Sequence, residues 1–457
     1  MEHIESAIQQ QEPICALATP EGVGAIGVIR VSGAESIALV GSVFKGKDLR
    51  VVASHTAHFG TLYDGSTALD EVLVTVFRSP RSFTKEDVVE IGCHGSTYII
   101  RQILKLLVRS GARMATPGEF TQRAFLNGQF DLVQAEAVAD LIAADSEASH
   151  RAALTQLRGG FSRQLAALRD QLIHFASLVE LELDFGEEDV EFAQRDDLRA
   201  LVVALQRTIA PLLDSFQYGN AVKEGVPVAI IGSPNVGKST LLNTLLNEEK
   251  AIVTPQAGTT RDIVEDVLVL SGIKFRFIDT AGIRQTDDLV EAIGIERSKQ
   301  AMQKARIVLF LYDDARALSE IQPLATALEA HQYALWIRTK GDLAKTNELY
   351  ATIDADEELL ISAHTQQGIE VLKERLVAVV GQGQATDTLV TNLRHYEQLS
   401  RTQRVLDDVL NGLDQQLTGD FLAQDIRLAL YHLGLITGAI SSDDLLAKIF
   451  SSFCIGK

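Results

Sequence analysis

Short apolar runs with strand character are separated by polar, glycine-containing turns over the first 118 residues. The runs ICALA, GVIRVSG, EVLVTVF and EDVVEIGCHG have the length and the β-branched content of strands. Gly22, Gly24 and Gly27 spell G-x-G-x-x-G, but strand-like IGVIRV follows in place of the helix that a dinucleotide-binding loop requires. Residues 1–118 are therefore predicted to form a β-rich α+β domain with interspersed helices.

Apolar residues recur at helical spacing in two stretches that are far apart in the chain. AEAVADLIAA, LAALRDQLIHFASLVELEL and DLRALVVALQRTI carry this pattern through residues 119–220, and it returns within residues 382–457. A strand-containing α/β segment, residues 221–381, separates the two stretches. The pattern thus predicts an α/β multidomain protein in which this segment is inserted into one discontinuous all-α helical domain.

The inserted segment begins with a phosphate-binding pattern. Strand-like VPVAIIG leads into GSPNVGKST, and helix-like LLNTLL follows, which is G-x-x-x-x-G-K-[ST] in the context of strand, loop and helix. Glycines let the backbone approach phosphate oxygens, Lys238 can reach the β- and γ-phosphates, and the Ser239 hydroxyl can hold Mg²⁺. The predicted nucleotide-binding residues here are Asn235, Val236, Gly237, Lys238, Ser239 and Thr240.

Further stations follow in the order of a Ras-like GTPase. GTTRD offers Thr260 as a second Mg²⁺ ligand, and the strand FRFIDTAG brings Asp279 to the outer shell of the metal. The predicted GTP-binding residues of these two loops are Gly258, Thr259, Thr260, Asp279, Thr280, Ala281 and Gly282. Ile283 stands where many small GTPases have the glutamine that orients water. Hydrolysis is therefore either very slow or served by other residues, for which Asn235 and Glu291 are the candidates.

The run TKGD is predicted to select the base. Asp342 can accept both the ring N–H and the amine of guanine, which adenine cannot offer, and the Lys340 stem can cover the base. Thr339 replaces the usual asparagine, which removes one expected hydrogen bond to the base. ELLISA supplies Ser362 and Ala363 as the last guanine-contacting loop, so GTP is favoured over ATP.

The composition argues against a membrane-spanning protein and against a secreted protein held together by disulfides. Hydrophobic residues make up 46% of the 457, but no stretch approaches the roughly 20 consecutive apolar residues of a bilayer span. The polar N-terminus shows no signal peptide, and three distant cysteines argue against a disulfide framework. We expect a cytoplasmic protein without membrane association. Its net charge of −19 requires any nucleic-acid contact to come from a local patch or a partner.

Several motifs together resemble the MnmE (TrmE) family of tRNA-modifying GTPases. They are GSPNVGKS, IVTPQAGTTRD, DTAGIR, VEAIGIERS and the terminal CIGK, and the N-terminal and helical runs fit the same family over essentially the whole chain. The resemblance implies a K⁺ ion held by Asn235, Thr254, Gln256 and Thr259 where paired G domains meet. It also implies that Glu291 organises the attacking water, although an acidic residue at a solvated helix start is the alternative.

For the N-terminal domain, the resemblance implies a folate-binding-like module that forms a homodimer. It would bind a tetrahydrofolate derivative, 5-formyl- or 5,10-methylene-tetrahydrofolate, through Arg30, Glu90, Gln129 and Lys457. Arg30 suits a carboxylate and Glu90 suits the amine-bearing pterin edge, whereas Gln129 stands at a position that is often lysine. A structural role for Arg30 or Glu90 remains the alternative.

The resemblance also implies the reaction. Together with an MnmG-type FAD protein, in a heterotetramer, such a chain adds a carboxymethylaminomethyl or aminomethyl group to carbon 5 of wobble uridine in certain tRNAs. The alternative functions are a GTP-switch binding protein, such as a ribosome-assembly GTPase, and a folate enzyme regulated by GTP.

The chain ends in SSFCIGK, which has the outline of a prenylation box. Gly456 is not aliphatic, Lys457 is a poor terminal residue for that signal, and no polybasic stretch accompanies it. The family's C-terminal signature instead implies that Cys454 is an active-site thiol, catalytic in uridine modification. A small buried cysteine in a final helix is the inert alternative.

Overall fold

The computed structural model describes residues 12–184, 195–248, 266–278, 300–329, 332–343, 358–380, 389–451 and 453–456. The chain forms two compact units. The first unit comprises Met1–Ala143, Ala153–Gln206 and Gln398–Lys457, and the second comprises Ala144–Ala152 and Arg207–Glu397. In the part of the chain that the structure describes, none of the helices has the length and apolar content needed to cross a membrane.

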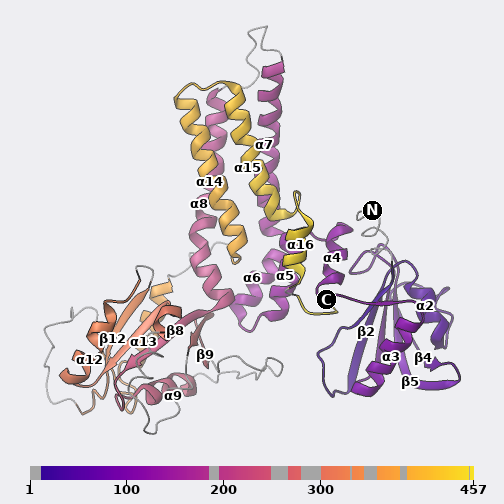
Figure 1. The fold of residues 1–457 in the computed structure, drawn as a ribbon, viewed down its shortest axis with the longest axis horizontal. Helices are drawn as coiled ribbons and strands as arrows, with labels where there is room; N and C mark the ends of the chain where they lie inside the picture. The colour runs from indigo at the N-terminus through magenta and orange to yellow at the C-terminus, as the bar shows by residue number, and fades with distance from the viewer. Residues whose placement is uncertain are drawn as a thin grey trace. The chain divides into compact units, whose positions relative to one another are not determined.

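The N-terminal part of the first unit contains a seven-stranded sheet in the order β3-β4-β5-β6-β2-β1-β7. Figure 1 shows this sheet together with helices α2 and α3. Its pairs are antiparallel except for β1 with β7. Every second strand residue, such as Ile29, Val74 and Ile91, is buried against two helices on one face. The elements are β1 (Ile14–Leu17), β2 (Ile26–Ser32), α2 (Ser36–Val43), β3 (Phe44–Lys45), β4 (Thr56–Asp64), β5 (Thr67–Phe77), β6 (Val88–His94), α3 (Thr97–Arg109) and β7 (Arg113–Met114).

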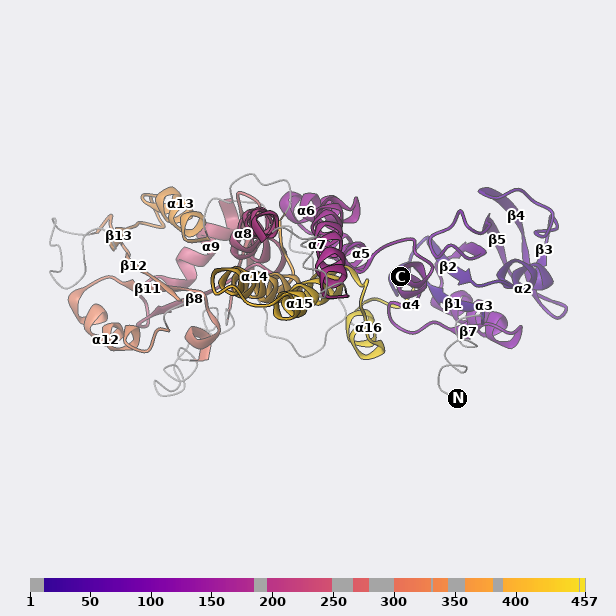
Figure 2. The ribbon, with the colours of Figure 1, turned by 90° about the horizontal axis from the view of Figure 1, so that it is seen from above.

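Helices from two separate stretches of the chain, residues 119–224 and 393–450, pack together, as α7 and α15 do in the first unit (Figure 2). Arg199 Nη2 lies 2.5 Å from Asp414 Oδ1, and Gln206 Nε2 donates to Asp407 Oδ1 at 2.7 Å, so the two sequence stretches form one bundle. The helices are α4 (Glu119–Leu126), α5 (Leu132–Ala143), α6 (Glu147–Leu157), α7 (Gly160–Asp184), α8 (Arg195–Glu224), α14 (Leu393–Asp414), α15 (Gly419–Thr437) and α16 (Asp443–Phe450). Of these, α6, α8 and α14 extend into the second unit.

The second unit contains a six-stranded sheet in the order β13-β12-β11-β8-β10-β9. All neighbours are parallel except β9 and β10, and every residue of the central strand β11 is buried. The carboxyl ends of β8 and β12 lie at the same edge of the sheet, which is where ligands bind in such sheets. The elements are β8 (Val226–Gly232), α9 (Lys238–Glu248), β9 (Asp266–Leu270), β10 (Ile273–Phe277), β11 (Ile307–Tyr312), α12 (Ala315–Ala325), β12 (Tyr333–Arg338), β13 (Glu358–Leu360) and α13 (Ile369–Val380).

Candidate functional site

The phosphate-binding loop lies between the end of β8 and the start of α9. Asn235 and Gly237 have φ angles of 64° and 96°, and the chain enters the helix when Leu241 N donates to Gly237 O at 2.9 Å. Positive φ angles of this kind are typical of anion-binding loops, in which successive backbone N–H groups point at the bound anion. Ser239 and Thr240 lie in the first turn of α9, at the positive end of its dipole.

Lys238 folds back over this loop. Its Nζ donates to Gly232 O at 2.6 Å and to Ser233 O at 2.9 Å. Burial lowers the pKa of Lys238, because the charged ammonium is partly removed from water. Phosphate oxygens would replace these two carbonyl acceptors with charged ones, which favours anion binding at this loop.

Thr339 joins the base-selecting run to the phosphate-binding loop. Its hydroxyl donates to Val236 O at 2.7 Å, its backbone N–H donates to Tyr312 O at 2.8 Å, and only 6% of the residue is exposed. The sequence predicted only that threonine loses a hydrogen bond to the base. The structure shows that Thr339 connects two loops that are distant in the sequence.

The Asp342 carboxylate, which is predicted to select guanine, is held by the loop that contains Ser362. Ser362 Oγ donates to Asp342 Oδ1 at 2.7 Å, and this hydrogen bond lowers the pKa of Asp342. Gly341 N donates to Ile361 O at 2.9 Å, and Ala363 follows the buried Ser362. The structure therefore brings the TKGD and ISA runs together at the edge that carries the phosphate-binding loop.

Lys340 has a partner that the sequence did not reveal. Its Nζ pairs with Asp313 Oδ2 at 2.6 Å, just beyond β11, and its φ is 57°. The acidic pair after the apolar run IVLFLY was the available signal, because parallel strands end at one edge.

Several predicted contacts lie outside the described residues and stay predictions. They are Thr254, Gln256, Gly258, Thr259, Thr260, Asp279, Thr280, Ala281, Gly282, Glu291 and Lys457. Of the predicted metal ligands, Asn235 and Ser239 are described. Asn235 is exposed within the loop, and its amide oxygen is a hard donor that suits K⁺. Ser239 lies in the first turn of α9, where loops of this kind provide a hydroxyl ligand for Mg²⁺.

A charged pair crosses two neighbouring strands of the N-terminal sheet. Arg30 on β2 is directly opposite Glu90 on β6, and Nη2 and Nε lie 2.7 and 3.0 Å from Oε1. The exposed fractions of the Arg30 and Glu90 side chains are 20% and 29%. The rings of Phe83 and Phe120 lie 5.5 and 5.7 Å from the guanidinium carbon, an aromatic setting that the sequence did not reveal.

Gln129 lies next in the sequence to Phe130, which contacts one of the aromatic side chains beside Arg30. It is exposed in the turn after α4, where its N–H donates to Ala124 O at 2.8 Å. The next residue, Phe130, packs against Phe83 with ring centroids 5.7 Å apart. Phe83 thus contacts both Arg30 and the residue that follows Gln129.

The C-terminal segment lies against the same domain. Cys454 is exposed and its carbonyl accepts from Gly118 N at 3.4 Å, so the thiol does not belong to a buried final helix. Gly456 is buried with a φ of 91°, and a Cβ there would lie 2.2 Å from Leu17 O. Because Leu17 and Arg30 belong to adjacent strands, the tail lies near the charged pair.

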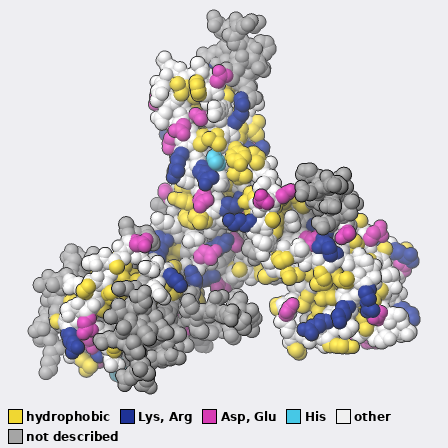
Figure 3. Space-filling model, in the orientation of Figure 1, with side chains coloured by type: hydrophobic (Ala, Val, Ile, Leu, Met, Phe, Trp, Pro, Cys, Tyr) yellow, Lys and Arg dark blue, Asp and Glu magenta, His cyan; other side chains and the backbone are white. Residues whose placement is uncertain are grey.

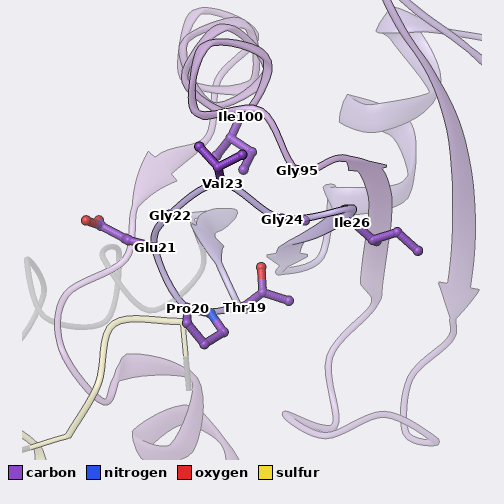
Figure 4. Close-up of a pocket in the computed structure, with 10 residues that line it drawn as sticks. Thr19, Pro20, Glu21, Gly22, Val23, Gly24, Ile26, Gly95 and Ile100 are labelled. Atoms are coloured by element: carbon purple, nitrogen blue, oxygen red, sulfur yellow. The ribbon is translucent and has the colours of Figure 1, made fainter. Parts of the chain in front are cut away.

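A hollow of about 260 Å³ lies next to the carboxyl end of β1 (Figure 4). Residues 19–24 line it together with Ile26, Gly27, Gly95 and Ile100. The glycine-rich loop curves around the hollow and then enters β2, as predicted for a turn before a strand. Neither Arg30 nor Glu90 lines it.

Two protein-family models match this chain, one over its N-terminal domain and the other over most of the remaining residues. The family model described as "GTP-binding protein TrmE N-terminus" matches residues 13–129, and the "MnmE helical domain" model matches residues 132–454. The solved G-domain of FeoB from Methanococcus jannaschii is 26% identical and covers 34% of this chain and 98% of its own, with a TM-score of 0.24. At that score it adds nothing to the fold assignment.

Curated relatives cover nearly the full chain. A "tRNA modification GTPase MnmE" from Cytophaga hutchinsonii is 55% identical over 98% of both chains. A protein of the same name from Flavobacterium johnsoniae is 51% identical over 98% of this chain and 99% of its own. These matches confirm the predicted fold class and family: the chain belongs to the MnmE (TrmE) family of tRNA modification GTPases.

Proposed function

We propose that this chain is a potassium-dependent, GTP-hydrolysing enzyme that takes part in tRNA modification in the cytoplasm. The observation that carries the GTPase half is the hydrogen bond from Thr339 to Val236, because it assembles the phosphate-binding and base-selecting loops into one site. Asp342, held by Ser362, then selects guanine through two acceptor oxygens.

In this proposal, the protein contributes mainly positioning and charge. Lys238 exchanges its loop carbonyls for the β- and γ-phosphates, and Ser239 and Thr260 hold Mg²⁺. When bound, Mg²⁺ and K⁺ would supply positive charge next to the phosphates, as an arginine finger does in other GTPases. Asn235, Thr254, Gln256 and Thr259 hold K⁺, and Glu291 orients the attacking water in place of the missing glutamine.

The modification half of the proposal rests on the N-terminal domain and the tail. Arg30 and Glu90 bind the charged and hydrogen-bonding groups of a tetrahydrofolate derivative, with Gln129 and Lys457 at its edge. The tail is anchored by Gly456 at Leu17, which supports a role for the exposed Cys454 thiol beside this ligand.

The remaining components are partners. We propose a homodimer that joins an MnmG-type FAD protein in a heterotetramer and modifies carbon 5 of wobble uridine with a carboxymethylaminomethyl or aminomethyl group. On the face that Figure 3 shows, basic side chains are interspersed with acidic and apolar ones. With a net charge of −19, this distribution supports a division of labour in which the flavoprotein supplies much of the tRNA contact.

Two measurements test the two halves separately. Cys454→Ser is expected to abolish the modified wobble nucleoside in digested cellular tRNA while GTP turnover stays within about twofold, because the thiol lies in the other compact unit. Retention of the modified nucleoside would contradict the thiol role. GTP turnover in K⁺ should exceed that in Na⁺ by at least about tenfold, and Asn235→Ala should remove this difference; equal rates in the two salts would reject the potassium site.

A further inference from the structure

The β9–β10 hairpin connects the two predicted switch loops. The GTTRD run precedes β9 and the DTAG run follows β10, so each predicted switch loop is adjacent to this hairpin in the sequence. β10 also pairs with β8, the strand that leads into the phosphate-binding loop, and Ile278 N donates to Val228 O at 3.0 Å. The hairpin is thus hydrogen-bonded, through β10, to the strand that leads into the predicted nucleotide site.

The turn of this hairpin packs against a segment from a distant part of the chain. Ser271 and Gly272 have φ angles of 50° and 80°, and a Cβ on Gly272 would lie 2.7 Å from the Ala148 Cβ. Ala148 belongs to Ala144–Ala152, which is part of the second unit and packs on its hydrophobic core. The close approach leaves room only for glycine at the turn.

An ion pair reinforces this contact. Lys274 of β10 pairs with Asp145, and the exposed fractions of the two side chains are 9% and 53%. Lys274 Nζ also lies 3.5 Å from Lys223 O, at the end of the helix that enters β8. A nearly buried ammonium needs a counter-charge, which Asp145 supplies. Lys274 therefore connects the hairpin to two chain segments, through the Asp145 carboxylate and through the Lys223 carbonyl.

We propose that the β9–β10 hairpin transmits the nucleotide state of the GTP site to helix α6 through this contact. The segment that carries Asp145 and Ala148 continues directly into the later turns of α6, which belong to the first unit. The γ-phosphate orders switch loops in other GTPases, and a packed contact converts such a shift into a change elsewhere. The inference deepens the proposed function, since it assigns the regulation of the same GTP site.

Backbone hydrogen exchange of α6 tests the inference without any tRNA. In the unmodified chain, exchange at Glu147–Leu157 should differ at least threefold between the GDP-bound and GTP-analogue-bound states. Lys274→Met keeps the aliphatic stem, and Asp145→Asn changes a half-exposed side chain; each should reduce that difference by at least half. Arg316→Met, which removes a surface ion pair of the same unit, is the matched control and should leave the difference unchanged.

Charge reversal separates the ion pair from general damage. Lys274→Glu alone should lose the nucleotide response of α6, and adding Asp145→Lys should restore at least half of it. An α6 that exchanges identically in both nucleotide states, or single variants that respond like the unmodified chain, would overturn the inference.

A second readout separates this inference from the proposed function. Lys274→Met and Asp145→Asn should lower the number of modified nucleosides formed per GTP hydrolysed at least threefold, with GTP turnover itself within twofold. If the unmodified chain shows the α6 response but supports no tRNA modification, the proposed function fails and the inference stands. An unchanged ratio in both variants would count against the inference alone.

Discussion

The Thr339 hydroxyl donates a hydrogen bond to the Val236 carbonyl at 2.7 Å, and this bond joins the two halves of the proposed GTP site. Thr339→Ala leaves the Val236 carbonyl without this donor in a buried position. The expected loss is about 1–2 kcal/mol, or roughly 5- to 30-fold in GDP and GTP affinity, measured with a fluorescent nucleotide. Thr339→Ser retains the hydroxyl and is the control; equal affinities for the two variants would contradict the assignment.

Asp342→Asn should change the base that the site accepts. Guanine offers two donors to the carboxylate, whereas xanthine has a carbonyl where guanine has its amine, and an asparagine amide can donate to that carbonyl. GTP affinity should fall at least about 100-fold, and the affinity for xanthosine triphosphate should rise. Competition binding with both nucleotides checks this, and an unaltered preference for GTP would argue against Asp342 as the base selector.

Glu90→Gln should weaken folate binding without touching the GTP site. The change removes the charge that Arg30 pairs with and one acceptor for the pterin edge, which is worth about 1.5–3 kcal/mol, or roughly 10- to 100-fold in Kd. Calorimetry with 5-formyl-tetrahydrofolate measures it. Glu71→Gln, an exposed change on β5 of the same sheet, should bind like the unmodified chain, and equal Kd values for both variants would sink the Glu90 assignment.

Gly456→Ala should displace the C-terminal tail. An added methyl would lie 2.2 Å from Leu17 O at a φ of 91°, so the tail cannot keep its position. Modified wobble nucleoside should be lost while GTP turnover is unchanged. Gly65→Ala has the same kind of positive φ, 62°, but open space around the methyl, and it separates the clash from the backbone strain of about 1–2 kcal/mol. Full modification by Gly456→Ala would disprove the need for a docked tail.

The three cysteines should differ sharply in alkylation at pH 8. Burial raises the pKa of both Cys15 and Cys93 to about 11, so only about one molecule in a thousand carries a thiolate at either position. Cys454 is exposed and should be labelled first by iodoacetamide, as followed by peptide mass spectrometry. The raised pKa values also make the folding stability depend on pH. The folded state favours the neutral thiols, so their contribution to stability is present below pH 9.0, the pKa of an unperturbed thiol, and is lost as the pH rises through 11.

Local patterns were sufficient for much of this molecule. The G-x-x-x-x-G-K-[ST] spacing after an apolar strand predicted the loop at Gly237 and Lys238, and helical periodicity predicted the bundle. Each of these signals lies within a few residues of the chain, where backbone geometry alone relates sequence to structure.

Long-range contacts were not predictable in the same way. Thr339 appeared in the sequence only as a departure from asparagine, and nothing near Arg30 in the chain indicated Phe83 and Phe120. These partners meet because strand register and helix packing bring distant residues together.

The sequence by itself determined the family, the order of the GTPase motifs and the unusual C-terminal cysteine, because these depend on residue identity and spacing. Only the tertiary structure decided what Thr339 binds, where the tail is anchored, and that the β9–β10 turn packs on Ala148. The physical reason is that each of these contacts joins segments more than a hundred residues apart, and their distance is set by the packing of whole elements.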